Sequence, residues 1–376
     1  MVDEFKEVTK VGWGENIKNS FIGALIGILL FFLSFFVLWT NEGRTNMAKV
    51  AVKMAAVQAD KIDPAYDGQG VSVSGMLVTG DSLTDPKFLK PVSGIALRRS
   101  VEMFAWVEEK ETKEKQNTGG STTKETTYRY EKKWTSDPEK SSGFKHPEGH
   151  SNPPLAFGDE SFTAKDARIG AYAVDPGTIQ LPGSVGLELD TAVINIKGAY
   201  RLSGQYLFLG NGLPDDPQVG DIRVSFSVVP NQIKVTAFGK SEGGALVPYL
   251  HKGKDKLYRA IGGTRDEAIA LMAREYTVTG WIMRLVGFLM MWFGLQALFG
   301  PIIAVLNVLP FLGKVGRFVW GVITFFVSLG LSLVVIVVSM IAHNIWALLA
   351  VMVLIVGFFI WLKMKKKQAV AASPAK

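Results

Sequence analysis

The chain has 376 residues, of which 48% are hydrophobic, with no cysteine and a formal net charge of +7. The lack of cysteine excludes disulfides, zinc–thiolate sites and a cysteine nucleophile. The excess positive charge gathers beside apolar stretches, where lysines set membrane orientation and contact anionic headgroups, so it does not indicate nucleic-acid binding.

Four apolar stretches are long enough to cross a membrane, because a spanning helix needs about 20 apolar residues. They predict transmembrane helices over 21–39, 281–309, 315–341 and 345–362, the second interrupted near Gly300-Pro301. A cleaved signal peptide is the alternative for the first stretch. Its apolar run is longer than that of a signal peptide, and Leu38-Trp39-Thr40-Asn41 lacks a small-residue cleavage pattern.

Basic residues near the span ends predict the orientation, since such residues stay in the cytoplasm. They occur in the N-terminal segment 1–20, after the second span at Lys314 and Arg317, and in the tail 363–376 at Lys363, Lys365, Lys366 and Lys367. With four spans, all these clusters lie on one side. Residues 40–280 are then extracytoplasmic, including the Gly119-Gly120 turn. The lack of cysteine and of Asn-x-Ser/Thr sites favours a bacterial cytoplasmic membrane, with the endoplasmic reticulum or inner nuclear membrane as the eukaryotic alternative.

The segment 40–280 predicts a mostly-β domain with a helix at each end, which makes the chain an α+β membrane protein. Helices are expected over 46–60 and after the capping box Thr264-Arg265-Asp266-Glu267. Strands are expected at 71–78, 95–109, 126–134, 171–174, 193–200, 205–209, 222–229 and 232–237, with a loop at 144–159.

Two further patterns concern the β domain. Asn117-Thr118-Gly119-Gly120 predicts a hairpin between the strands at 95–109 and 126–134, and their mixed charges predict cross-strand ion pairs on a solvated ribbon. The similarity of Val73-Ser74-Gly75-Met76-Leu77 to Leu202-Ser203-Gly204-Gln205-Tyr206 leaves a duplicated β unit as an alternative to chance.

The residues offer little for catalysis. His146-Pro147-Glu148-Gly149-His150 could supply zinc ligands, but a loop rich in Pro and Gly lacks the fixed geometry that a metal needs, so we assign no metal site. The chain has no Gly-x-Ser-x-Gly elbow, no P-loop and no dinucleotide fingerprint. We expect no catalytic residue, no cofactor and no enzymatic activity. A membrane-bound hydrolase is an alternative that would need a nucleophile and a base brought together in the β domain.

Small residues in the spans predict helix association. Gly23 and Gly27 form a Gly-x-x-x-Gly pair, which suits close contacts within or between subunits. Gly280, Gly287 and Gly294 recur every seven residues and keep one seam facing a neighbouring helix, which we expect to belong to the same chain.

The interrupted stretch after Gly300 predicts a short piece, from Ile302 to Leu312, in the cytoplasmic half of the membrane. Lys314 and Arg317 would anchor its exit among lipid headgroups. A broken helix carrying Asn307 is also found in transporters, so a channel or a lipid or ion transporter is the alternative function. Arg284 lies close enough to the outer interface to snorkel.

Several motifs resemble the transmembrane protein 43 family, also called LUMA. They are Asn41-Glu42-Gly43-Arg44, the run from Arg99 to Glu108, Tyr128-x-Tyr130-x-x-x-Trp134, Gly220 to Phe226, Thr236-Ala237-Phe238-Gly239, and the block from Gly287 to Gly313. The resemblance covers nearly the whole chain in order. It implies a multipass protein that organises membranes and scaffolds proteins through self-association, with no settled enzymatic activity. The expected partners are lipids, further copies and other membrane proteins, and the basic tail fits a bacterial member.

Overall fold

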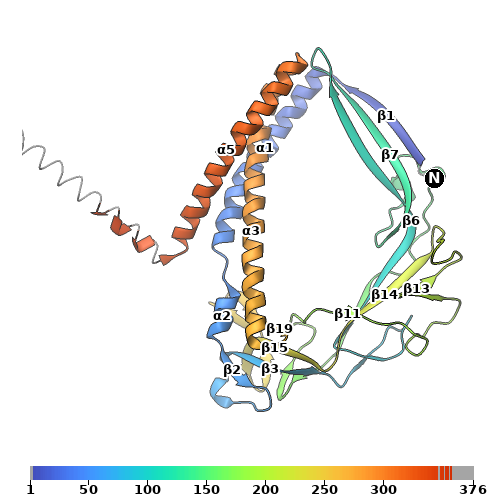
Figure 1. Ribbon diagram of the computed structural model, residues 1–376, viewed down its shortest axis with the longest axis vertical. Helices are drawn as coiled ribbons and strands as arrows, with labels where there is room; N and C mark the ends of the chain where they lie inside the picture. Colours follow the sequence, from blue (N-terminus) through green and yellow to red (C-terminus); the bar gives the residue numbers. More distant parts are fainter. Residues whose placement is uncertain (1–2, 346–347, 351, 355, 358–376) are drawn as a thin grey trace, which may run out of the picture. The chain divides into compact units, whose positions relative to one another are not determined.

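The structure is a computed structural model that describes residues 3–345, 348–350, 352–354 and 356–357. The chain divides into two compact units (Figure 1). The β unit comprises Met1–Val8, Asn46–Lys113 and Glu125–Tyr276. The helical unit comprises Thr9–Thr45, Glu114–Lys124 and Thr277–Lys376. The expected domain over 40–280 therefore gains the N-terminal residues and loses the segment 114–124, which packs with the helices.

The first sheet of the β unit has seven strands, in the order β19-β15-β16-β10-β9-β3-β2. An additional pairing of β15 with β3 closes five of these strands into a ring, whose interior holds buried side chains such as Val73, Val235 and Tyr172. The strands are β2 (Ala55–Gln58), β3 (Gly70–Val78), β9 (Ala167–Ile169), β10 (Tyr172–Val174), β15 (Ile233–Glu242), β16 (Ala245–Val247) and β19 (Arg259–Gly262).

The second sheet has eight strands, in the order β1-β7-β6-β14-β13-β12, with β11 on β14 and β8 on β6. Its core includes Leu97, Val101 and Val224, which lie at alternate positions of β6 and β14. The strands are β1 (Asp3–Val11), β6 (Ala96–Gln116), β7 (Thr122–Thr135), β8 (Glu160–Thr163), β11 (Val185–Gly186), β12 (Arg201–Ser203), β13 (Tyr206–Leu209) and β14 (Ile222–Val229). Two small pairs complete the strands, β4 (Ser82–Leu83) with β5 (Val92–Ser93) and β17 (Tyr249–His251) with β18 (Asp255–Leu257).

Strand β1 was not expected, because the lysines of residues 1–20 predict a cytoplasmic segment. The structure pairs one of these lysines, Lys6, with Glu125 of β7 at 3.7 Å. Glu4 pairs with Arg129 at 3.1 Å, and Glu7 pairs with Lys145 at 3.1 Å. Opposite charges facing each other across strands stabilise a pairing, so charged residues of this segment hold β1 at the sheet edge.

Most of the other predicted elements are confirmed. The hairpin forms between β6 and β7, with cross-strand ion pairs such as Lys133 with Glu109 at 2.8 Å. The capping box also forms, since the Thr264 amide donates to Glu267 Oε2 at 2.8 Å.

Two predictions about the β unit are wrong. No strand forms over 193–200, where Asp190 accepts bonds from the Ala192 and Val193 amides and holds a turn instead. The helix expected over 46–60 is only α2 (Met47–Lys53), followed by β2. The two similar segments also differ in structure, because Gly75 lies within β3 whereas Gly204 occupies a turn with φ +57°, and this favours chance over duplication.

Helix α2 ends early because an arginine side chain binds the carbonyl groups at its C-terminus. The Arg265 guanidinium donates to the carbonyl oxygens of Ala51 and Met54, both at 3.0 Å. Carbonyls at a helix C-terminus have no partner within the helix, and a cation there is favourable. The chain is then free to extend into β2, which pairs in parallel with β3.

Three helices of the described chain are long and apolar enough to cross a membrane. They are α1 (Trp13–Glu42), α3 (Arg265–Leu298) and α5 (Pro310–Ala342), with the short α4 (Gly300–Leu306) between the last two. The break expected near Gly300-Pro301 is therefore confirmed. Half of the fourth expected span, 345–362, lies outside the described residues, so four spans are not shown.

Candidate functional site: the helix seam and its polar clamp

Helices α1 and α3 pack along a seam in which α3 contributes small residues. A Cβ at Gly27 would lie 2.8 Å from the Gly294 carbonyl oxygen, and one at Gly287 would lie 2.5 Å from Leu38 Cδ2. Gly280 faces the Arg44 guanidinium at the far end. Residue numbers rise on α1 as they fall on α3, so the two helices are antiparallel. The absence of side chains at these positions is what permits the backbones to approach.

The two glycines of the Gly-x-x-x-Gly pair have different surroundings. Gly27 belongs to the seam with α3, whereas a Cβ at Gly23 would meet nothing within 4 Å in the part of the chain that is described. The structure therefore brings Gly27, Gly280, Gly287 and Gly294 together in one chain and leaves Gly23 apart from them.

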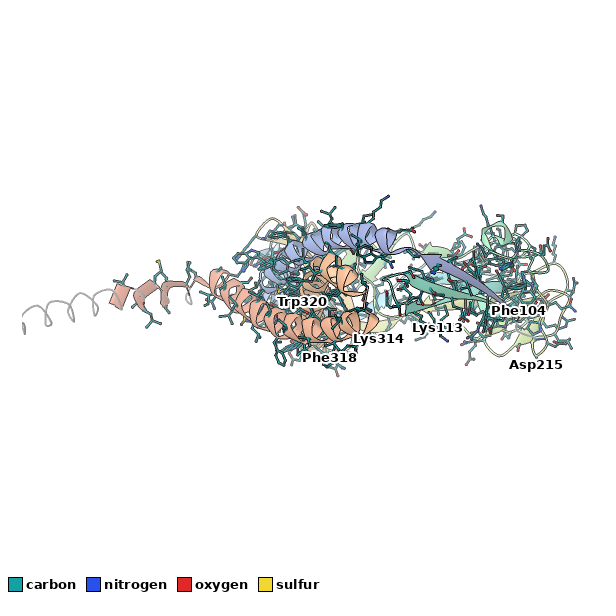
Figure 2. The ribbon with its side chains drawn as sticks, turned by 90° about the horizontal axis from the view of Figure 1, so that it is seen from above. Phe104, Lys113, Asp215, Lys314, Phe318 and Trp320 are labelled. Atoms are coloured by element: carbon teal, nitrogen blue, oxygen red, sulfur yellow. The ribbon has the colours of Figure 1, made fainter. Side chains whose placement is uncertain are left out.

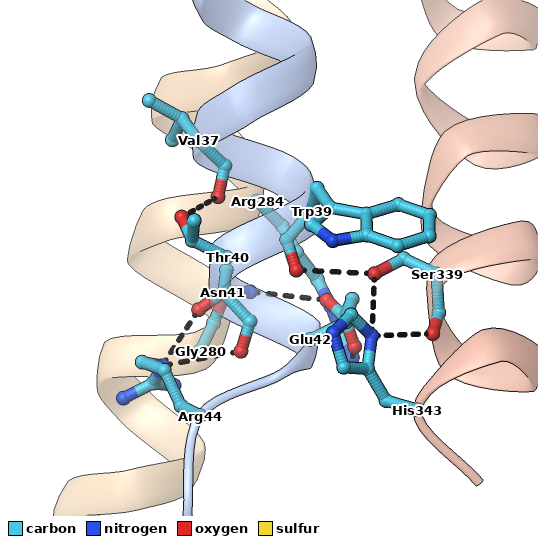
Figure 3. Close-up of polar contacts among 10 residues, drawn as sticks. All are labelled: Val37, Trp39, Thr40, Asn41, Glu42, Arg44, Gly280, Arg284, Ser339 and His343. Atoms are coloured by element: carbon cyan, nitrogen blue, oxygen red, sulfur yellow. Dashed lines mark hydrogen bonds and ion pairs between the residues drawn. The ribbon is translucent and has the colours of Figure 1, made fainter. Parts of the chain in front are cut away.

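An ion pair closes the seam at the C-terminal end of α1 (Figure 3). Arg284 Nε and Nη2 donate to the two carboxylate oxygens of Glu42, each at 2.8 Å. The Glu42 side chain is only 6% exposed, and the guanidinium also lies over the Trp281 ring at 4.9 Å. A two-pronged arginine–carboxylate pair fixes orientation as well as charge. Arg284 thus binds Glu42 within the bundle, whereas its position in the sequence predicts that it snorkels to the outer interface.

Further polar groups near α1, α3 and α5 surround this pair. Together they form what we call the polar clamp, which comprises Trp39, Asn41, Glu42, Arg44, Gly280, Arg284, Ser339 and His343. Asn41 Nδ2 donates to the Gly280 carbonyl at 3.2 Å, and Arg44 Nε donates to Asn41 Oδ1 at 3.0 Å. Ser339 Oγ on α5 donates to the Trp39 carbonyl at 3.1 Å. The clamp therefore connects α1 to both α3 and α5.

The polar clamp as a unit was not predicted from the sequence. Asn41-Glu42 follows the first span and Arg284 stands a few residues inside the second, so in antiparallel helices the opposite charges reach the same depth. That signal was present in the sequence. Ser339 and His343 carried no comparable signal, because single polar residues on an apolar helix have many roles.

The tip of the β6–β7 hairpin packs at the opposite end of α1. Asn16 Nδ2 donates to the Gly120 carbonyl at 2.9 Å, and the Gly119 amide donates to the Val308 carbonyl at 3.0 Å. The Trp13 ring lies against Gly120, which has φ +80° and no side chain to block it. Trp13 Nε1 in turn donates to the Ala304 carbonyl at 3.1 Å. The hairpin tip, α1 and α4 are thereby joined at one end of the helical unit.

The basic residues predicted to contact headgroups are placed only in part. Lys314 and Arg317 are exposed on the first turns of α5, shortly after the break at Gly300. Asn307, between α4 and α5, is 6% exposed, and its Oδ1 has no hydrogen-bond partner within the described chain. Lys363, Lys365, Lys366 and Lys367 lie outside the described residues.

The His-Pro-Glu-Gly-His loop belongs to the β unit and packs against the N-terminal strand. His150 Nδ1 bonds to the His146 carbonyl at 2.9 Å, and its Nε2 faces Asp3 Oδ2 at 3.2 Å. The ring stacks on Tyr130 with centroids 4.0 Å apart. Burial, together with a hydrogen bond to Glu108, raises the pKa of Tyr130 to about 12. Both nitrogens of His150 are thus engaged by protein groups, as expected of a structural histidine.

No group of three His, Cys, Asp or Glu side chains that could hold a metal ion occurs in the residues described. The features that are built from several elements are the seam, the polar clamp and the hairpin-tip junction. These features, with three apolar helices and a large β unit, define a membrane-anchored protein with a large extramembrane part.

The chain belongs to the transmembrane protein 43 family. The family model matches residues 103–345. The chain is 28% identical over 365 residues to transmembrane protein 43 of Homo sapiens, covering 92% of this chain and 90% of the relative. It is 30% identical to the Mus musculus protein over 76% of this chain and 75% of the relative, and 28% identical to the Drosophila melanogaster homolog over 74% and 77%. No solved structure matches this chain. The predicted family is therefore confirmed, and an integral membrane location agrees with it.

Proposed function

We propose that this protein is a non-enzymatic scaffold that organises a membrane through self-association and contacts with lipids or other membrane proteins. The observation that supports this most is the close α1–α3 seam, in which backbone groups approach at the glycines and Glu42 pairs with Arg284. Polar side chains that bond one another suit a fixed anchor better than a transport path, where they would bind cargo.

The location is part of the same proposal. The helix ends that carry Lys18, Lys314 and Arg317 face the cytoplasm, and the Glu42 end of α1 faces outward. The protein resides in a bacterial cytoplasmic membrane, or in the endoplasmic reticulum or inner nuclear membrane if its source is eukaryotic.

The mass of the full-length protein in lipid nanodiscs or mild detergent tests self-association. We expect particles of more than one copy, and we expect Gly23→Leu to shift them toward single copies because it removes close approach on an open face of α1. Gly330→Leu is the matched control, since a Cβ there also meets nothing within 4 Å. Single copies in the unaltered protein would refute the proposal.

One observation favours a channel or transporter as the second candidate. The buried, unpartnered Asn307 Oδ1 lies at a break between helices, which is where transporters place polar groups. Ion flux across vesicles that contain the purified protein separates the two functions. A flux abolished by Asn307→Leu would favour transport over scaffolding.

A further inference from the structure

A groove between α3 and α5 opens close to the first turns of α5. It encloses about 420 Å³ and is lined by Trp292 and Gln296 from α3 and by Arg317, Phe318, Val322 and Phe325 among others from α5. Aromatic and aliphatic groups make up most of the wall. The two polar groups, Gln296 and Arg317, come from different helices and meet at the same groove.

Arg317 has no counter-charge within the described protein. Its side chain is exposed, and it makes no hydrogen bond or ion pair with another described residue. The chain contains no Asp or Glu after Glu275, so neither α3 beyond that point nor α5 can supply one. An unpaired guanidinium beside an apolar groove is complementary to an anion that carries an apolar chain.

The position of Arg317 along α5 matches the level of lipid headgroups. No charged residue occurs from Phe318 to Ala342, a stretch of roughly 37 Å as an α-helix. This is enough to cross a hydrocarbon core about 30 Å thick. The groove runs from Arg317 past Val322 to Phe325, about 12 Å toward the bilayer interior.

Two aromatic side chains near the groove, Phe318 and Trp320, point in different directions (Figure 2). Phe318 is 73% exposed, whereas the Trp320 ring lies 3.4 Å from that of Phe299, centroid to centroid, on the bundle side. Trp292 forms one wall and is held there by its Nε1, which donates to the Gly321 carbonyl at 3.1 Å. The groove wall is therefore fixed by a contact between α3 and α5.

We propose that this groove binds an anionic glycerophospholipid, with the phosphate at Arg317 and Gln296 and one acyl chain along Phe318, Val322 and Phe325. The inference deepens the lipid contact in the proposed function and rests on α5 lying in a membrane. The ligand comes from the surrounding bilayer. Lys314, one turn earlier on α5, contributes general attraction to the headgroup layer without lining the groove.

The test uses the full-length protein and native mass spectrometry with palmitoyl-oleoyl phosphatidylglycerol or phosphatidylcholine. We expect preferential retention of phosphatidylglycerol and a loss of that preference in Arg317→Gln that exceeds the roughly fivefold effect of one basic residue at the surface. Lys314→Gln removes the same charge outside the groove and should have a clearly smaller effect. Equal losses in the two variants would show unspecific surface attraction and overturn the proposal.

A second pair of variants tests the apolar wall without changing charge. Val322→Trp should fill the groove and reduce lipid retention, whereas Val319→Trp, exposed on the same helix but outside the groove, should not. Excess inorganic phosphate should not displace the lipid, because the acyl chain supplies part of the affinity. Displacement by phosphate would identify an anion site instead. Copy number read from the same spectra reports on self-association separately, so either proposal can fail alone.

Discussion

Arg99 carries its charge into the interior of the β unit, where its side chain is 2% exposed. Its guanidinium bonds Asp85 Oδ2 at 2.5 Å and Glu160 Oε2 at 2.7 Å, and Asp85 is fully buried. The neighbouring Arg98 pairs with Asp159 at 3.2 Å but is 63% exposed. The two adjacent arginines therefore differ in role: Arg99 is a buried structural residue, whereas Arg98 lies on the surface.

Replacing Arg99 with Met should destabilise the β unit by about 3–5 kcal/mol, because it leaves the Asp85 carboxylate buried and uncompensated. Arg98→Met is the matched control and should cost about 0–1 kcal/mol, as exposed pairs do. Thermal unfolding of the detergent-solubilised protein, followed by tryptophan fluorescence, measures both. Similar midpoints for the two variants would contradict the buried pair.

Tyr130 supplies a prediction about pH. Its pKa of about 12 in the folded protein exceeds the ordinary value of 10.0, because burial and Glu108 disfavour the phenolate. The stabilisation from the neutral phenol is therefore complete below about pH 10 and is lost as pH rises toward 12. Titrating tyrosinate absorbance should reveal a late-ionising phenol that is missing in Tyr130→Phe. A first ionisation near pH 10 at this position would contradict the burial of the ring cluster.

At the scale of elements, the α1–α3 seam depends on residues without side chains. Gly294→Leu would place new atoms within 2.8 Å of the Gly27 carbonyl and the Phe31 amide, both of them backbone groups that cannot move aside. We expect this change to separate the helices and lower the midpoint of thermal unfolding by several degrees. Gly23→Leu should leave the midpoint nearly unchanged and act only on copy number, since its surroundings are open. An unchanged midpoint in Gly294→Leu would mean that the seam is not packed as described.

At the scale of the whole molecule, the contacts of the hairpin tip bear on the side of the membrane on which the tip lies. The basic residues of the sequence predict the Gly119-Gly120 turn outside, whereas the contacts of this turn with Trp13 and Val308 place it at the α1 end that carries Lys18. The cysteine-free chain permits single-cysteine labelling with a membrane-impermeant maleimide. We expect Thr118→Cys to react from the same side as Lys18→Cys and from the opposite side to Thr40→Cys.

The labelling pattern distinguishes an external turn from one at the Lys18 end of α1. Reaction of Thr118→Cys on the side of Thr40→Cys would restore the external turn, and the contacts between the tip and α1 would then not form in the membrane. Labelling of Thr40→Cys and Lys18→Cys from one common side would show that α1 does not cross.

The sequence by itself determined the apolar helices, the break near Gly300, most strands and the family, because these depend on local periodicity, turn residues and short motifs. The seven-residue spacing of Gly280, Gly287 and Gly294 also predicted their common face. Such signals lie within a single segment, so no partner has to be known to read them.

Only the tertiary structure decided which segments meet. Glu42 and Arg284 stand 242 positions apart, and β1 pairs with β7, a strand that follows α1 in the chain. The lysines of residues 1–20 fit a membrane signal and a sheet edge equally well, and local chemistry cannot choose between two roles for one charge. The sequence also could not place the hairpin tip, because a Gly-Gly turn specifies the path of the chain but not the surface on which it packs.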